Sequence, residues 1–202
     1  SEEEEDGGDA DNGNSPPASS GNSSGSVSLI DRVPSNAMAL AKLDLKQILD
    51  KSKSSPQAKS MLENMVPPPF KGVFDDPASV GIDLSEPLLA YFLVNPVEPD
   101  EDPMSGIAAK VSDSAKLKDF LQSIGVDKAA KNQESKDSYV LWEMDTDEHY
   151  FAFSDEIVIL VGCDGTSLHG TKLVVEELAR FMNADGSDSF AKSHDLSGLD
   201  AK

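Results

Sequence analysis

The sequence predicts an α+β domain: an antiparallel sheet of about six strands with helices packed mainly on one face. Short apolar runs of strand length, such as 88–94 and 157–161, are bounded by turn residues. Apolar residues at helical spacing recur in 114–124 and 168–182. The elements follow the order β-α-α-β-β-α-β-β-β-α, which is typical of an antiparallel sheet with segregated helices.

The first half of this domain is predicted to hold three strands and two helices. Its first strand has apolar residues at both odd and even positions, so we expect both of its faces to be partly buried. The second helix begins at Pro56 and ends at three consecutive prolines. The predicted elements are a strand at 38–45, helices at 46–53 and 56–66, a loop or broken helix at 70–82, and strands at 88–94 and 106–111 joined by an acidic turn.

The second half is predicted to hold two helices around three strands. Asp113 or Ser114 caps the first helix and Gly125 stops it. Strands are expected at 139–144, 150–154 and 157–161, with the second helix at 168–182.

Composition divides the chain into three parts. Residues 1–28 are acidic, then rich in Gly, Asn, Ser and Pro, and we predict a disordered tether there. Residues 29–184 form the α+β domain. Residues 185–202 are polar, with Phe190, Leu196 and Leu199 as weak anchors, and are interpreted as the start of a further unit.

The charge of the chain argues against several classes of partner. The formal net charge is −20, and residues 1–28 contribute −7 of it through seven acidic and no basic side chains, which leaves −13 for the rest. Nucleic-acid binding requires clustered Lys and Arg, so we expect no nucleic-acid partner. Adsorption to anionic lipid headgroups is disfavoured for the same reason.

The single cysteine, Cys163, allows no disulfide within the chain. It follows the apolar run 158–161, and we interpret it as a small core residue at the end of a strand. No stretch reaches the roughly 20 apolar residues that a membrane helix needs. Membrane attachment would therefore come only through a lipid on a residue upstream of Ser1.

The sequence gives no candidate catalytic, cofactor-binding or metal-ligating residue. The histidines His149, His169 and His194 have no partners at metal-ligand spacing. The Gly-bearing stretch 162–167 lacks the lysine of a phosphate loop, so a strand-to-helix turn is the preferred interpretation, with an anion cradle as the alternative. We therefore expect a protein that is not an enzyme and carries no cofactor.

Two further features leave alternatives open. The acidic turns 145–148 and 100–102 would offer carboxylates to calcium, but neither has the ligand order of a known calcium loop. We interpret them as solvated turns. Trp142 is assigned to sheet packing rather than to stacking on a sugar ring.

Residues 33–52 resemble the opening of a group of uncharacterised lipoproteins of the Bacteroidetes. In that group a V-P-x-x-A strand leads into a K-x-(I/L)-(L/W)-x-K-S helix, as Val33 to Ser52 do here. The phrase 81–87 before a strand is similar to a second recurring phrase, and 189–195 is similar to the transition toward a further unit. The resemblance covers residues 33–95 well and the rest only by element order. It implies an N-terminal portion or a short member of a family that has no established activity.

The same resemblance implies a location. Surface-exported lipoproteins of this phylum carry a serine and an acidic run directly after a lipidated cysteine, and Ser1 to Glu5 resembles that signal with the cysteine absent. The resemblance implies a lipid-anchored protein on the outer membrane, exposed at the cell surface and made with a signal peptide. An ordinary solvating acidic tail is the alternative.

Three functions remain open from the sequence. The preferred one is a non-catalytic envelope module that binds a protein or a glycan. The others are a part of a larger hydrolytic enzyme whose active site lies outside this chain, and a structural spacer.

Overall fold

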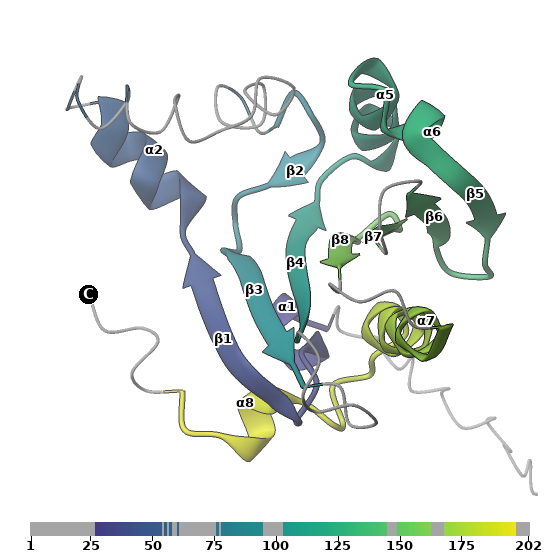
Figure 1. Ribbon diagram of the computed structural model, residues 1–202. Helices are drawn as coiled ribbons and strands as arrows, with labels where there is room; N and C mark the ends of the chain where they lie inside the picture. The colour runs from purple at the N-terminus through teal and green to yellow at the C-terminus, as the bar shows by residue number, and fades with distance from the viewer. Residues whose placement is uncertain are drawn as a thin grey trace, which may run out of the picture.

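The structure is a computed structural model, and it has the predicted mixed α+β class. It describes residues 27–53, 55, 57, 60, 76, 78–94, 103–144, 149–162 and 168–196. One eight-stranded antiparallel sheet forms its centre (Figure 1). The strands are β1 (Ala37–Leu43), β2 (Ile82–Asp83), β3 (Leu88–Leu93), β4 (Met104–Val111), β5 (Ala130–Ser135), β6 (Val140–Met144), β7 (His149–Phe153) and β8 (Ile157–Gly162).

The strands lie in the order β1-β3-β4-β8-β7-β6-β5, and β2 pairs with the end of β4. The sheet therefore has β1 at one edge and β5 at the other. The helices are α1 (Leu29–Arg32), α2 (Leu45–Lys53), α5 (Ser114–Ser123), α6 (Val126–Ala129), α7 (Leu168–Met182) and α8 (Phe190–Ser193).

The helices cover both faces of the sheet, so the expectation that they lie mainly on one face is wrong. Leu29 of α1 and Leu178 of α7 share a core with Leu89 of β3. Leu117 of α5 shares a second core with Trp142 of β6. Because neighbouring strand residues point to opposite faces, the two cores lie on opposite sides of the sheet.

The core on the α7 side is built around an aromatic pair. Tyr91 stacks on Phe181 with ring centroids 5.8 Å apart. Gly106 lies opposite Tyr91 on β4, and a Cβ at this position would come within 2.6 Å of the Tyr91 ring. Glycine therefore lets the ring lie flat across the strand and reach α7.

The core on the α5 side includes side chains of α5, a helix with a defined start and end. The Asp113 carboxylate accepts a hydrogen bond from the Lys116 backbone N–H at 3.1 Å, which confirms the predicted start of α5. Gly125 ends the helix with a φ of 81°. Trp142 is 2% exposed and meets Phe153 edge to face at 5.1 Å, so its predicted role in sheet packing is confirmed.

The sheet has eight strands rather than the predicted six or so. The two strands that were not predicted are β2 and β5. Strand β5 has the sequence Ala-Lys-Asn-Gln-Glu-Ser, and five of its six residues are exposed. An edge strand with solvent on both faces needs no apolar alternation, so the pattern that identifies buried strands is absent. Strand β2 is two residues long and gives no periodic signal.

Both ends of the described chain are fixed to the body of the domain. The Phe190 backbone N–H donates to the Val33 carbonyl at 2.8 Å, and the Ser189 side chain is fully buried. The Ser189 hydroxyl caps α8 by accepting from the Lys192 N–H. These contacts place α8 beside α1. The predicted helix at 56–66 and the turn at 95–102 lie largely outside the described residues.

Candidate functional site: an open apolar face of the sheet

Three neighbouring strands present apolar side chains to the same face of the sheet. Ala41 of β1 lies opposite Ala90 of β3, and Ala90 lies opposite Ile107 of β4. Residues directly opposite one another in an antiparallel pair point to the same face. We call this surface the open face, and it consists of Ala39, Ala41, Leu43, Ala90, Phe92 and Ile107.

The large side chains of the open face are exposed. Ile107 is 53% exposed, Leu43 45% and Phe92 42%. Met38 is 63% exposed and lies beside them, where the pairing of β1 with β3 shifts by one residue. Exposed single apolar residues are ordinary, but a contiguous group on three strands is typical of an interaction surface.

The open face continues into the core on the α5 side. Ile107 lies opposite Leu160 of β8, which lies opposite Phe151 of β7, and Phe151 packs against that core. Leu117 and Leu121 of α5 cover this half of the face. Within the described part of the chain no helix covers the other half, over β1, β3 and the start of β4.

Strand β1 therefore differs from its prediction. Partial burial on both faces was expected, but Met38, Ala39, Ala41 and Leu43 are exposed. The physical reason is position: β1 is an edge strand, and no helix of the described residues covers the open face there. The sequence Ala-Met-Ala-Leu-Ala-Lys-Leu shows apolar residues on both sides of the strand but not what lies against them.

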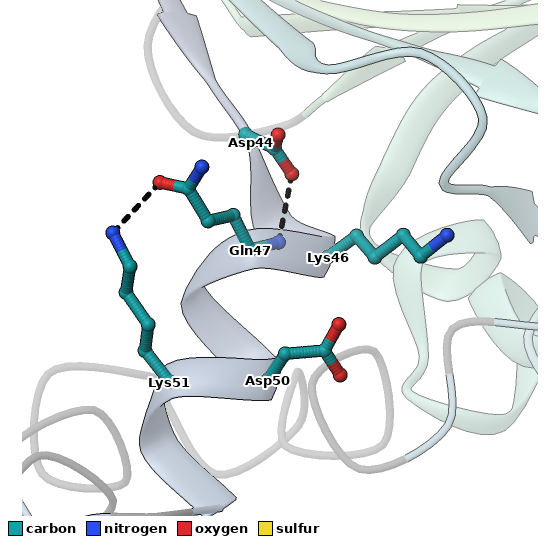
Figure 2. Close-up of a pocket in the computed structure, with 5 residues that line it drawn as sticks. All are labelled: Asp44, Lys46, Gln47, Asp50 and Lys51. Atoms are coloured by element: carbon teal, nitrogen blue, oxygen red, sulfur yellow. Dashed lines mark hydrogen bonds between the residues drawn. The ribbon is translucent and has the colours of Figure 1, made fainter. Parts of the chain in front are cut away.

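A hollow of about 420 Å³ lies on α2, which extends from the end of β1 (Figures 1 and 2). Asp44 accepts from the Gln47 backbone N–H at 2.8 Å, and Lys51 donates to the Gln47 side chain at 2.9 Å. Lys46 and Asp50 project together from the other side of the helix (Figure 2). Charges of both signs alternate here, so the hollow has no uniform field to select an ion.

A second hollow of about 400 Å³ lies between the start of α5 and the β5–β6 hairpin. Its hydroxyl groups are engaged in holding loops. Ser114 donates to the Asp155 carboxylate at 2.5 Å, and the Ser154 hydroxyl accepts from the Ile157 backbone N–H at 3.2 Å. The hydrogen bond from Ser114 to Asp155 joins the start of α5 to the turn between β7 and β8. The remaining lining residues are Ala115, Lys118, Ser135, Lys136, Ser138, Tyr139, Val140 and Phe153.

Two ionisable groups with shifted pKa values, Lys110 and Tyr91, take part in contacts that hold elements of the fold together. Glu86 accepts from Lys110 at 2.9 Å and from the Leu29 backbone N–H at 3.2 Å, which joins β4 to the start of α1. The hydrogen bond that Lys110 donates to the Glu86 carboxylate raises the pKa of Lys110. Burial raises the pKa of the Tyr91 phenol, which therefore stays protonated near neutral pH.

Of the three histidines that the sequence singled out, the structure describes the side chains of His149, which begins β7, and His194, which follows α8. The His149 ring lies across Gly162, where an added Cβ would come within 2.8 Å of it, and His194 stacks on Phe190 at 4.0 Å. Cys163, the stretch 163–167 and the acidic turns 100–102 and 145–148 lie outside the described residues. Among the residues that are described, no group of three or more His, Cys, Asp or Glu side chains could hold a metal ion.

The open face was not identified from sequence. A signal was present in the four exposed apolar residues of 37–43 together with Phe92 and Ile107, but it reads equally as core. No helix in the described part of the chain is long and apolar enough to span a membrane.

Comparison of this chain with models of protein families, with curated proteins and with solved structures gives no match. The resemblance in residues 33–95 therefore stays a prediction.

Proposed function

We propose that this protein is a non-catalytic interaction module that binds a partner protein through the open face. The proposal rests on one observation, which is that α5 covers only part of one face of the sheet. Half of that face is packed under α5, while Leu43, Phe92 and Ile107 remain exposed on the other half. Burying these side chains against a partner would gain roughly 25 cal/mol per Å² of apolar surface. A protein partner is preferred to a glycan, because Leu43 and Ile107 offer no polar group to sugar hydroxyls and Phe92 is the single aromatic side chain among the six residues of the open face. Trp142 and Tyr91 are buried.

Replacing Phe92 and Ile107 together by serine is expected to abolish partner binding while leaving the fold intact. Both side chains are exposed, so the free energy of unfolding should change by less than about 1 kcal/mol. The measurement is quantitative capture of cell-envelope proteins by the immobilised domain, with urea unfolding in parallel. We expect capture of a defined protein to fall about tenfold or more.

The matched control replaces Asn132 by serine on β5, which is exposed at the opposite edge of the same sheet. It should leave capture unchanged. Equal capture by the wild type and the Phe92/Ile107 variant would contradict the proposal, and so would the absence of any protein captured above the level of bare resin.

We further propose that the module is displayed at the cell surface as a lipid-anchored protein of the outer membrane. The support is the acidic run Glu2 to Asp6 and the resemblance of residues 33–52 to surface lipoproteins. Replacing Glu2 to Glu5 by alanine in the full-length lipoprotein is expected to retain it inside the cell envelope. The measurement is its digestion by protease added to intact cells. Unchanged digestion would show that the acidic run is not an export signal.

A further inference from the structure

The open face is centred on a row of apolar side chains that crosses five strands. Each residue of this row lies opposite the next one in a paired strand, so all of them point to the same face of the sheet. The row consists of Ala41 of β1, Ala90 of β3, Ile107 of β4, Leu160 of β8 and Phe151 of β7. We call it the central row, and at about 4.8 Å between strands it is about 19 Å long.

Larger side chains lie on both sides of the central row. Leu43 is two residues from Ala41 toward the end of the sheet at which α5 begins. Phe92 is two residues from Ala90 in the other direction, so each lies about 7 Å from the row. His149 lies in line with Phe92, across β4 and β8. A helix with its side chains is about 10 Å wide, so one helix along the central row would contact both Leu43 and Phe92.

An element that lies on this surface must satisfy its own backbone hydrogen bonds. Strands β3, β4 and β8 pair with a neighbour on both sides, so their backbone N–H and C=O groups are engaged within the sheet. An α-helix satisfies its backbone groups within a single segment. Helix α5 already packs in this way on the neighbouring part of the same face. At 1.5 Å per residue, a helix of about 13 residues matches the length of the central row.

The end of the sheet nearest to Phe92 and His149 is joined by acidic stretches of sequence. Residues 94–103 connect β3 to β4, 145–148 connect β6 to β7, and 163–167 follow β8. The conformation of most of these residues lies outside the described part of the chain, but the described strand ends fix which end of the sheet they join. We call it the acidic end. These stretches hold no Lys or Arg and eight acidic residues, which are Glu98, Asp100, Glu101, Asp102, Asp145, Asp147, Glu148 and Asp164.

The lysines of the central strands do not offset this charge at the open face. Lys42 lies opposite Leu89, and Lys110 lies two residues from Ala108. Leu89 and Ala108 belong to the core on the α7 side. Because side chains alternate between the two faces of a strand, both lysines point away from the open face.

Other basic side chains are paired or lie at the opposite end of the sheet. Arg180 of α7 reaches Asn36, just before β1, at 3.3 Å, but it also forms ion pairs with Glu177 and Asp188. Helices α2 and α5, at the opposite end, carry charges of both signs. An element on the central row would therefore meet net negative charge on its side toward the acidic end.

We propose that the partner contacts the open face through a cationic amphipathic helix of about 13 residues. Its apolar side would lie on the central row, and its Lys or Arg side chains would point toward the acidic end. This inference rests on the proposed function and names the chemistry of the partner. Salt should weaken the attraction, because at physiological ionic strength it screens exposed charges more than about 8 Å apart.

The test uses a synthetic peptide of about 14 residues, with leucine along one helical face and lysine elsewhere, labelled with fluorescein. Its binding to the intact chain is measured by fluorescence anisotropy at several concentrations of sodium chloride. We expect saturable binding that weakens as salt rises. A peptide with glutamate in place of each lysine should bind about tenfold more weakly or worse. The same should hold for a peptide of identical composition in scrambled order, because its leucines form no single face.

Replacing Phe92 and Ile107 together by serine tests the apolar contact. This variant should bind the lysine peptide about tenfold more weakly or worse, since both side chains lie under the proposed helix. Asn132→Ser on β5 is the matched control and should leave binding unchanged. The lysine peptide should also compete with the captured envelope protein for the immobilised wild-type domain.

Four amide substitutions between β3 and β4 test the charge. They are Glu98→Gln, Asp100→Asn, Glu101→Gln and Asp102→Asn. Together they should weaken binding about threefold or more and reduce its dependence on salt. The control replaces each glutamate of 2–5 by glutamine, which removes the same number of charges from the start of the chain. It should change binding less than about twofold.

Binding of the lysine peptide that is unaffected by the Phe92/Ile107 replacement overturns this inference, because the peptide would then respond to net charge alone. Equal losses of binding in the two sets of amide substitutions also overturn it. If the lysine peptide does not bind but the Phe92/Ile107 variant still loses capture of an envelope protein, the partner has a different chemistry and the proposed function stands.

Discussion

Replacing Gly81 by alanine is expected to destabilise the domain by about 3 kcal/mol or more. Gly81 has a φ of 80°, a conformation that costs a residue with a side chain about 1–2 kcal/mol. A Cβ at this position would also lie 2.3 Å from the Asp113 carbonyl oxygen and 2.7 Å from the Leu117 backbone nitrogen. Both contacts are with backbone atoms, so relief requires a shift of the start of α5.

A shift of the backbone at Gly81 would also disturb the junction between β4 and α5. Its carbonyl accepts from the Ser112 N–H at 2.8 Å and the Asp113 N–H at 3.4 Å, at the junction of β4 and α5. Moving this junction displaces Leu117, which is 2% exposed under the sheet. The measurement is urea unfolding of the Gly81→Ala variant followed by the fluorescence of the buried Trp142.

Gly125 provides a matched control for Gly81. Its φ of 81° is nearly the same, but nothing lies within 4 Å of an added Cβ. Gly125→Ala should therefore cost only the conformational part, about 1 kcal/mol. Equal losses of stability in the two variants would show that the close approach of Gly81 to α5 contributes nothing.

Replacing Arg32 by methionine is expected to destabilise the domain by about 2 kcal/mol. The guanidinium donates to the carbonyl of Met182 at 2.9 Å and to that of Phe181 at 3.3 Å, at the end of α7. A cation here also interacts favourably with the negative end of the helix dipole. Methionine keeps much of the volume of the side chain, so the loss measures the two unsatisfied carbonyls more than a cavity.

The burial of Arg32 offsets part of the stabilisation that its hydrogen bonds to α7 provide. Arg32 is 8% exposed, and desolvation lowers the pKa of its guanidinium. Its Nε atom is buried without a hydrogen-bond partner among the described residues. These costs keep the expected loss near 2 kcal/mol rather than higher, since replacing a buried charge by an apolar group removes a desolvation penalty as well.

Glu156 separates the capping role of Arg32 from its ion pair. Its carboxylate lies 3.3 Å from the guanidinium, but its side chain is 55% exposed. Glu156→Gln should therefore cost less than about 0.5–1 kcal/mol in the same urea unfolding experiment. A loss as large as that of Arg32→Met would mean that the ion pair, rather than the capping of α7, holds α1 in place.

Strong local signals located most of the elements. The stripe of apolar residues in 168–182 defines α7 with the bounds that the structure shows, and Asp113 and Gly125 mark the start and end of α5. The run 157–161 identifies β8 because a strand buried on both faces is apolar throughout. Strand β5 and the short helices α1, α6 and α8 gave no such signal, because four residues or a polar edge strand form no periodic pattern.

The sequence by itself determined the α+β class, the acidic charge and the bounds of the long elements, because these depend on composition and on contacts between near neighbours. Only the tertiary structure decided which side chains are covered. The apolar residues of β1 look alike in sequence, yet Ala37 is buried under the α7 side while Leu43 and Met38 are exposed. Coverage depends on where distant segments such as α5 and α7 pack. On one face β1 packs into the core that includes α7, whereas the core that includes α5 contains no residue of β1 among the described residues.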